Sequence, residues 1–274
     1  MKDIQSLFDL SGRVAVVTGG AGFLGKQFCE ALTEAGAQVV VADLDAAKAE
    51  KVASEYNKNS DQTALGLSLD VTDPDSVRHV MTTTMEKFGK LDILVNSAAL
   101  DPKFDKTGAG KHISAFEDFP LNSWREALDV NLTGMFLCCQ AAGRLMKEAG
   151  AGSIINICST YGLGGPDQRL YESLGEPRQY KPVYYTVSKA GVLGLTKYIA
   201  TYYHGTDIRC NALTPGGVER GHSPEFQEAY AQRTVLDRMA HPHEMKGAVV
   251  FLASEASSYM TGSNLVVDGG WTAW

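Results

Sequence analysis

The sequence predicts an α/β fold, in which helices cover both faces of a doubly wound, parallel sheet of seven strands. Three observations lead to this prediction. Short apolar runs of strand length alternate along the chain with longer segments of helical period. Strands that are repeatedly followed by helices are typical of βαβ units, whose right-handed crossovers place helices on both faces of a parallel sheet. No repeat, low-complexity tract or interdomain linker divides residues 1–274, so we expect a single domain.

The individual elements follow from these runs. The expected strands are 13–18, 38–43, 63–69, 91–96, 152–158, 207–213 and 264–268. The expected helices are 23–35, 45–58, 74–88, 121–149, 183–204 and 243–253. Two long polar stretches, 101–120 and 162–182, interrupt the alternation, and both follow the end of a strand. Because open α/β sheets bind ligands beyond the carboxyl ends of their strands, we interpret both stretches as loop insertions over a substrate rather than as idle insertions.

Charge and composition argue against several classes of protein. The formal net charge is -7, whereas binding to nucleic acid or to an anionic membrane needs basic surface. The chain lacks a run of 18 apolar residues, and its first residues lack the apolar core of a secretory signal. The five cysteines lie in apolar segments and are odd in number, which predicts reduced thiols in a cytoplasmic protein. The adjacent Cys138 and Cys139 could form a redox pair, but we interpret them as two core positions of one helix.

A glycine-rich turn joins the first expected strand to the first long helix. Residues 18–25 read TGGAGFLG. Glycine permits a tight turn and lets backbone N–H groups approach a pyrophosphate, which then faces the N-terminus of the following helix. In this strand–turn–helix context the motif predicts a Rossmann-type dinucleotide site.

The residue that ends the second strand bears on which dinucleotide binds. Asp43 lies 18 residues after Gly25. A carboxylate at this place can accept hydrogen bonds from a ribose 2′-hydroxyl and would repel a 2′-phosphate. No Lys or Arg lies between Gly19 and Gly25 or immediately after Asp43. We therefore expect NAD, with NADP as the less favoured cofactor. The alternative role for Asp43 is the N-cap of the 45–58 helix.

Tyr185 and Lys189 are four residues apart in a segment of helical character, so both side chains lie on one helix face. Lowering the pKa of a tyrosine from about 10 to about 7 takes roughly 4 kcal/mol. A lysine ammonium about 4 Å away supplies about that much at an effective dielectric constant near 20. The pair could therefore serve as an acid/base. The spacing alone would favour the simpler interpretation, an exposed Tyr and Lys on an amphipathic helix.

The order of several further motifs resembles the short-chain dehydrogenase/reductase family, from about residue 8 to residue 273. Besides the glycine turn, the matching motifs are Asp70-Val71, Asn96-Ser97-Ala98-Ala99, Asn131 in DVNLTG, Ser159 in INICST, Tyr185 and Lys189 in YTVSK, Pro215-Gly216, and Asp268-Gly269-Gly270.

The resemblance implies a role for each matching position. Ser159 would orient the substrate oxygen, Tyr185 would exchange the proton, Lys189 would lower the tyrosine pKa and hold the nicotinamide ribose, and Asn131 would support a proton relay. The implied cofactor-binding residues are Gly19, Gly22, Phe23, Leu24, Gly25, Asp43, Asp70, Val71, Asn96, Ala98, Tyr185, Lys189, Pro215, Gly216 and Val218.

Three features depart from the pattern of the shorter family members. Phe23 replaces the middle glycine of the turn. Ser159 and Tyr185 are 26 residues apart, about twice the usual interval, so the 162–182 loop should bulge over the substrate. The threonine that often follows Pro-Gly is missing, so we expect other groups to contact the nicotinamide amide.

Several loop cations could favour a polar or anionic substrate, although solvated charge is the simpler interpretation: Lys103, Lys106, Lys111, Arg169, Arg178, Lys181, Arg220 and His222. His241 and His243 flank Pro242, which we interpret as a helix start rather than a metal site; we expect no metal.

Together these features predict an oxidoreductase that transfers a hydride between NAD and a polar secondary alcohol or ketone, such as a sugar, sugar acid or polyol. The alternatives are an NADPH-dependent carbonyl reductase and a non-catalytic dinucleotide sensor. The helical segment 121–149 contains three consecutive apolar residues, Met135, Phe136 and Leu137, which cannot all face a single core. Exposed apolar surface of this kind indicates a subunit interface, so we expect a homotetramer or homodimer. The C-terminal GGWTAW is expected to pack on a neighbouring subunit.

Overall fold

The computed structural model describes residues 3–59, 63–101, 115–174 and 178–274, and these form a parallel, seven-stranded sheet in the order β3-β2-β1-β4-β5-β6-β7. The strands are β1 (Val14–Thr18), β2 (Gln38–Asp43), β3 (Ala64–Ser68), β4 (Ile93–Asn96), β5 (Ala151–Ile157), β6 (Asp207–Pro215) and β7 (Asn264–Val267). The predicted doubly wound α/β fold is confirmed, and each strand lies where an apolar run predicted one.

The described helices are α1 (Ile4–Phe8), α2 (Phe23–Glu34), α3 (Ala46–Tyr56), α4 (Pro74–Phe88), α5 (Leu121–Leu128), α6 (Gly134–Ala149), α7 (Val183–Tyr202), α8 (Pro224–Ala231) and α9 (Lys246–Ala253). The short helices α1 and α8 were not predicted. The expected helix 121–149 is divided by a π-helical turn at Asp129–Thr133 into α5 and α6.

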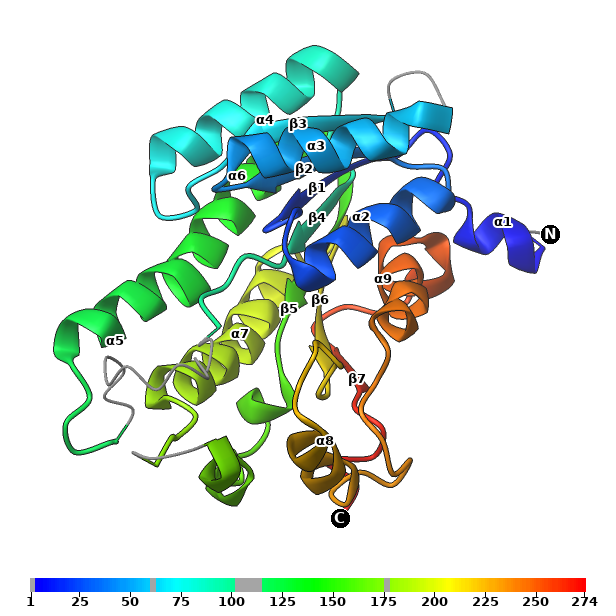
Figure 1. Cartoon of the computed structure of the whole chain (residues 1–274). Helices are drawn as coiled ribbons and strands as arrows, with labels where there is room; N and C mark the ends of the chain where they lie inside the picture. The colour runs from blue at the N-terminus through cyan, green and yellow to red at the C-terminus, as the bar shows by residue number, and fades with distance from the viewer. Residues whose placement is uncertain (1–2, 60–62, 102–114, 175–177) are drawn as a thin grey trace.

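Side-chain alternation in the strands divides the core into two layers, one on each face of the sheet. In β1, Ala15 and Val17 pack in the layer that contains Phe28 of α2, whereas Val16 packs in the opposite layer with Val192 of α7. Helices α2, α3 and α9 cover the first face, and α4, α6 and α7 cover the second (Figure 1). This burial on both faces explains why the strands read as continuous apolar runs.

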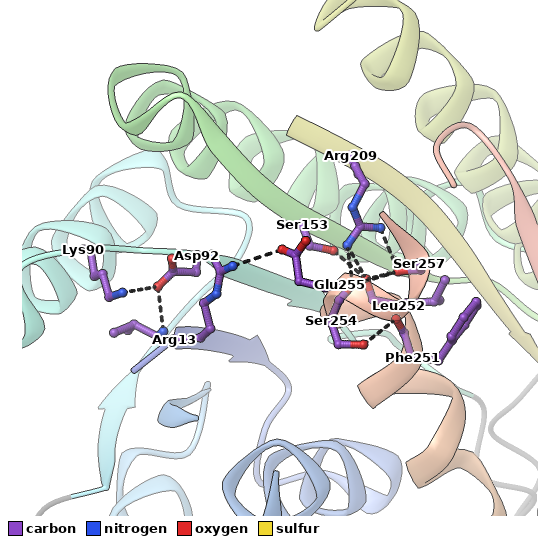
Figure 2. A network of polar contacts seen from close by, with 11 residues as sticks. Arg13, Lys90, Asp92, Ser153, Arg209, Phe251, Leu252, Ser254, Glu255 and Ser257 are labelled. Atoms are coloured by element: carbon purple, nitrogen blue, oxygen red, sulfur yellow. Dashed lines mark hydrogen bonds and ion pairs between the residues drawn. The ribbon is translucent and has the colours of Figure 1, made fainter. Parts of the chain in front are cut away.

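A network of polar contacts links the amino ends of several strands to the segment after α9 (Figure 2). Arg13 lies 3.2 Å from Asp92 and 3.1 Å from Glu255, which links the starts of β1 and β4 to the segment after α9. On β6, Arg209 donates to the carbonyl oxygens of Leu252 and Ser254 at 3.0 and 3.2 Å. Carbonyls at the end of a helix have no partner within the helix, so Arg209 satisfies the end of α9. This network lies at the amino ends of the strands, so it does not occupy the opposite end of the sheet, where the carboxyl ends of the strands lie.

The apolar excess on α6 is smaller than the sequence suggested. Met135 is buried and Leu137 is partly buried against the core, so of these three residues only Phe136, with 45% of its surface exposed, is largely open to solvent. Tyr198 and Tyr202 of α7 are exposed as well and stack on each other. Among the described residues, none of the helices is both long enough and apolar enough to cross a bilayer.

Candidate active site

A cavity of about 520 Å³ opens where the carboxyl ends of β1, β4, β5 and β6 meet. This volume lies within the range of small-molecule and cofactor pockets. The order of the sheet reverses direction between β1 and β4, and open α/β sheets bind ligands at such a switch point. Every residue predicted to bind the nucleotide lines this cavity except Asn96. Ser159 also lines it, whereas Asn131 does not.

The glycine turn packs too closely for a side chain at any of its four glycines, most clearly at Gly19 and Gly25. Gly19 has φ +62°, and a Cβ placed there would lie 2.8 Å from the Cα of Ala98. A Cβ on Gly25 would lie 2.0 Å from the carbonyl oxygen of Gly19. Helix α2 begins at Phe23, which occupies the place of the missing middle glycine, and no side chain caps this helix. Its N-terminus faces the cavity, so the turn fits the pyrophosphate of a dinucleotide.

Asp43 holds the glycine turn from the end of β2. One carboxylate oxygen accepts a hydrogen bond from the N–H of Ala21 at 3.1 Å, and the other accepts from the N–H of Asp45 at 3.2 Å. The N-cap of α3 is Asp45, which accepts from the N–H of Lys48. The alternative role of Asp43 as that cap is therefore wrong. Asp43 lines the cavity and, because a carboxylate has about four acceptor positions, can still accept from a hydroxyl.

The loops after β3 and β4 form the neighbouring wall. Asp70, Val71 and Ala98 line the cavity. Asn96 does not, which corrects the prediction for its side chain: it is buried, and its amide donates to Asn156 at 2.9 Å and to Cys139 at 3.1 Å. Asn96 is the last residue of β4, and strand alternation directs its side chain into the core.

The predicted acid/base group lies at the other end of the cavity. Tyr185 and Lys189 are both on α7 and both line the cavity with Ser159, which follows β5. The side chain of Ser159 acts to lower the pKa of Tyr185, although burial raises that pKa by more. The close packing of α7 on the turn after Ser159 requires Gly162, because a Cβ there would lie 2.7 Å from the carbonyl of Lys189. A serine hydroxyl and a phenol are therefore brought together although 26 residues separate them.

The electrostatics of this group differ from the sequence argument. Burial is the largest influence on Tyr185 and raises its pKa, and the negative charge of Asp101 raises it further. The ammonium of Lys189 lies 5.9 Å from the centre of the Tyr185 ring and donates to the carbonyl oxygen of Ile157 at 2.8 Å. Burial also lowers the pKa of Lys189. Burial and the charge of Asp101, rather than the charge of Lys189, therefore dominate the pKa of Tyr185.

Asn131 lies behind the cavity rather than on its wall. It is fully buried in the π-helical turn. Its side chain accepts from the N–H of Leu100 at 2.6 Å and donates to the carbonyl of Leu100 and to the hydroxyl of Ser188, both at 3.2 Å. Asn131 therefore ties the loop after β4 to α7, which is a positioning role.

An aromatic cluster that the sequence analysis missed closes the cavity on the substrate side: Tyr161, Tyr171, Phe226, Tyr230 and Met239, with Trp271 and Tyr185 packed against it. Trp271 stacks on Tyr230 with ring centres 4.4 Å apart. Trp271 of the C-terminal segment thus packs on its own chain, whereas Trp274 is exposed. The aromatic spacing in PEFQEAY was a possible signal, but it did not reveal which surface α8 would cover.

The predicted loop cations separate into three groups. Lys181, Arg220 and His222 line the cavity. Arg169 and Arg178 instead pair with Asp167 and Glu172. The remaining three, Lys103, Lys106 and Lys111, lie outside the described residues, as do most of 101–120 and part of 162–182.

The histidines around Pro242 stack on each other with ring centres 5.6 Å apart, and Pro242–Met245 is a short helical turn. No cluster of three or more potential metal ligands occurs within the described ranges.

Comparisons with known proteins agree with this geometry. The family model adh_short_C2, described as enoyl-(acyl carrier protein) reductase, matches residues 20–272. D-threitol dehydrogenase from Mycolicibacterium smegmatis is 35% identical over 97% of this chain and 95% of its own length. A 3-alpha-(or 20-beta)-hydroxysteroid dehydrogenase from Mycobacterium tuberculosis is 39% identical over 96% of this chain and 91% of its own. The crystal structure of a gluconate 5-dehydrogenase from Burkholderia cenocepacia, in complex with NADP and tartrate, is 29% identical with a TM-score of 0.85, over 99% of this chain and all of the other.

Proposed function

The chain belongs to the short-chain dehydrogenase/reductase family and acts on CH–OH donors with a nicotinamide cofactor; on that premise we propose that it oxidises a polar secondary alcohol with NAD and that Tyr185 is the general base. The observation that carries this proposal is the meeting of Ser159, Tyr185 and Lys189 at one end of a cavity whose other end holds Asp43 and the glycine turn.

The bound nicotinamide would supply the hydride-accepting ring. Gly19, Gly22 and the N-terminus of α2 would hold its pyrophosphate, and Lys189 would hold the nicotinamide ribose. The hydroxyl of Ser159 would orient the substrate oxygen. Tyr185 Oη would take the proton from the substrate hydroxyl, which is general base catalysis.

NAD is the proposed cofactor because of Asp43. Its carboxylate lines the cavity at the end of β2, where it would accept a hydrogen bond from a 2′-hydroxyl and repel a 2′-phosphate. The cation on the first turn of α3, Lys48, is paired with Asp45 at 2.7 Å. NADP is the competing possibility, since the related gluconate 5-dehydrogenase binds it.

We further propose that the substrate is carbohydrate-like. Charged and polar side chains, among them Lys181 and His222, line the substrate end of the cavity, and the related D-threitol dehydrogenase is named for a polyol. Retention of Ser159, Tyr185 and Lys189 in one site argues for catalysis rather than for a non-catalytic sensor.

The test measures turnover of the whole protein on secondary alcohols with NAD and with NADP. Tyr185→Phe is expected to lower kcat by about 10²- to 10⁴-fold with nucleotide binding retained. Tyr184→Phe is the matched control, because Tyr184 is the adjacent tyrosine but packs against Phe119 outside the cavity. Unchanged turnover by Tyr185→Phe would overturn the acid/base assignment, and nucleotide binding without turnover of any alcohol would favour a sensor.

We also propose that the protein is a cytoplasmic homodimer or homotetramer. All five cysteines are buried free thiols, which suits a reducing compartment. Exposed Phe136, Tyr198 and Tyr202 are candidates for the subunit interface. Light scattering that gave the mass of a monomer would contradict this assembly.

A further inference from the structure

An ion pair lies over the ring of the proposed catalytic tyrosine. Lys181 Nζ is 2.8 Å from a carboxylate oxygen of Asp101 and 4.0 Å from the centre of the Tyr185 ring. This ammonium is nearer to the ring than that of Lys189. The side chain of Lys181 is 10% exposed, and that of Asp101 is 51% exposed. All three residues line the same cavity, so the pair faces the space in front of the phenol.

The backbone around Lys181 is held in a defined position. The N–H of Lys181 donates to the side-chain oxygen of Gln168 at 2.9 Å, and the side-chain amide of Gln168 donates to the carbonyl oxygen of Lys181 at 3.2 Å. Asp101 belongs to the loop after β4, which Asn131 fixes through Leu100. The ion pair therefore joins the two loops that border the substrate end of the cavity, and both of its members are anchored.

The chemistry of the pair suits a hydroxyl group. A hydroxyl both donates and accepts, and the pair offers a carboxylate acceptor beside an ammonium donor. A carboxylate on the substrate would instead meet Asp101, which already neutralises Lys181, and like charges at a binding site discriminate against a ligand. Two other basic residues of the cavity, Arg220 and His222, do not supply a positive charge for a substrate carboxylate at this place. Arg220 lies over Phe23 at 5.0 Å, towards the nucleotide end, and burial lowers the pKa of His222, which favours its neutral form.

We propose that Asp101 and Lys181 form a subsite for a hydroxyl adjacent to the reacting carbon, so that the enzyme selects an uncharged polyol over both a hydroxy acid and a simple alcohol. This inference rests on the proposed function and names the substrate class of the same site. The neighbouring aromatic cluster, with Tyr161 and Tyr171, offers apolar contact to the carbon chain.

The test uses four probes with NAD: butane-2,3-diol and butan-2-ol, which differ by the adjacent hydroxyl, and threitol and threonate, which differ by a carboxylate. The wild-type enzyme is expected to have a higher kcat/KM for butane-2,3-diol than for butan-2-ol, and a higher kcat/KM for threitol than for threonate. Lys181→Met and Asp101→Asn should each lower the diol-to-butanol ratio of kcat/KM by about tenfold, the effect of losing a hydrogen bond to a charged group. Asp101→Asn should also lower the threitol-to-threonate ratio of kcat/KM, because it removes the negative charge that repels the carboxylate of threonate.

The matched controls are Lys147→Met and Asp207→Asn, at exposed positions outside the cavity, and both should leave the two ratios unchanged. Equal losses on the diol and on butan-2-ol would overturn the subsite, because they would indicate a structural role for the pair. A wild-type preference for threonate would overturn it as well.

A failure of the proposed catalytic function can be distinguished from a failure of the proposed subsite by measuring binding. If the wild type oxidised none of the four probes, the Tm of the protein with NADH would be measured with threitol and with threonate. A Tm increase from threitol that Lys181→Met abolishes would support the subsite without catalysis, and no increase would overturn it.

Discussion

The ammonium of Lys189 donates a hydrogen bond to the carbonyl oxygen of Ile157 across 2.8 Å. Ile157 is the last residue of β5, two positions before Ser159, and Lys189 is one turn after Tyr185 on α7. This bond therefore fastens the helix that carries the phenol to the strand that carries the serine. Lys189 has a positioning role in addition to its charge.

Replacing Lys189 should change both the rate and its pH dependence. Oxidation requires deprotonated Tyr185, and burial raises the pKa of that phenol, so kcat/KM for oxidation should rise with pH through the alkaline range. Lys189→Met removes a nearby cation and should move this rise to still higher pH, with a loss of about 10²-fold or more near neutrality. The measurement is a pH profile of kcat/KM. An unshifted profile would mean that Lys189 acts through the Ile157 contact alone.

Asp43 should decide the choice of cofactor. Asp43→Asn removes the charge that would repel a 2′-phosphate but keeps an oxygen that can accept from Ala21. The NAD-to-NADP ratio of kcat/KM should fall by about tenfold or more. Asp207→Asn, which removes a carboxylate at an exposed position outside the cavity, is the control and should keep the ratio. A wild-type preference for NADP would refute the role given to Asp43.

Asn131 should affect the loop after β4 rather than the chemistry directly. Asn131→Ala leaves the N–H and carbonyl of Leu100 without their side-chain partner, which should cost about 1–3 kcal/mol of unfolding free energy. The loop carries Ala98 and Asp101 on the cavity wall, so KM for both nucleotide and substrate should rise. Denaturant unfolding and initial rates measure the two effects. A loss of kcat with unchanged KM would point instead to a direct role in proton transfer.

Arg209 should contribute to stability without contributing to catalysis. Arg209→Met removes hydrogen bonds to Leu252, Ser254 and Ser257 (Figure 2) and to the carbonyl oxygen of Met260. Because these buried acceptors lose a charged donor, the unfolding free energy should fall by about 1.5–3 kcal/mol. Arg144→Met, at an exposed position of α6, should leave it nearly unchanged. The kcat of the folded Arg209→Met enzyme should match the wild type, since Arg209 does not line the cavity.

The sequence predicted the strands and most helices because burial on both faces requires continuous apolar runs, and those runs are local. Asp43, the glycine turn and the Tyr185–Lys189 spacing were also recognisable locally, since each depends on a few neighbouring residues. The division of 121–149 was not predictable, because the π-helical turn depends on Asn131 reaching Leu100 and Ser188, which are distant in sequence.

By itself, the sequence determined the fold class through its local apolar runs. The grouping of Ser159, Tyr185 and Lys189 in one predicted site came from the resemblance of its motifs to a known family. Only the tertiary structure decided that the side chain of Asn96 enters the core, that burial dominates the pKa of Tyr185, and that Lys181 and Asp101 meet above its ring. These outcomes depend on how loops from separate strands pack in three dimensions. Periodicity and motif spacing describe only the residues of one element, so they cannot report such contacts.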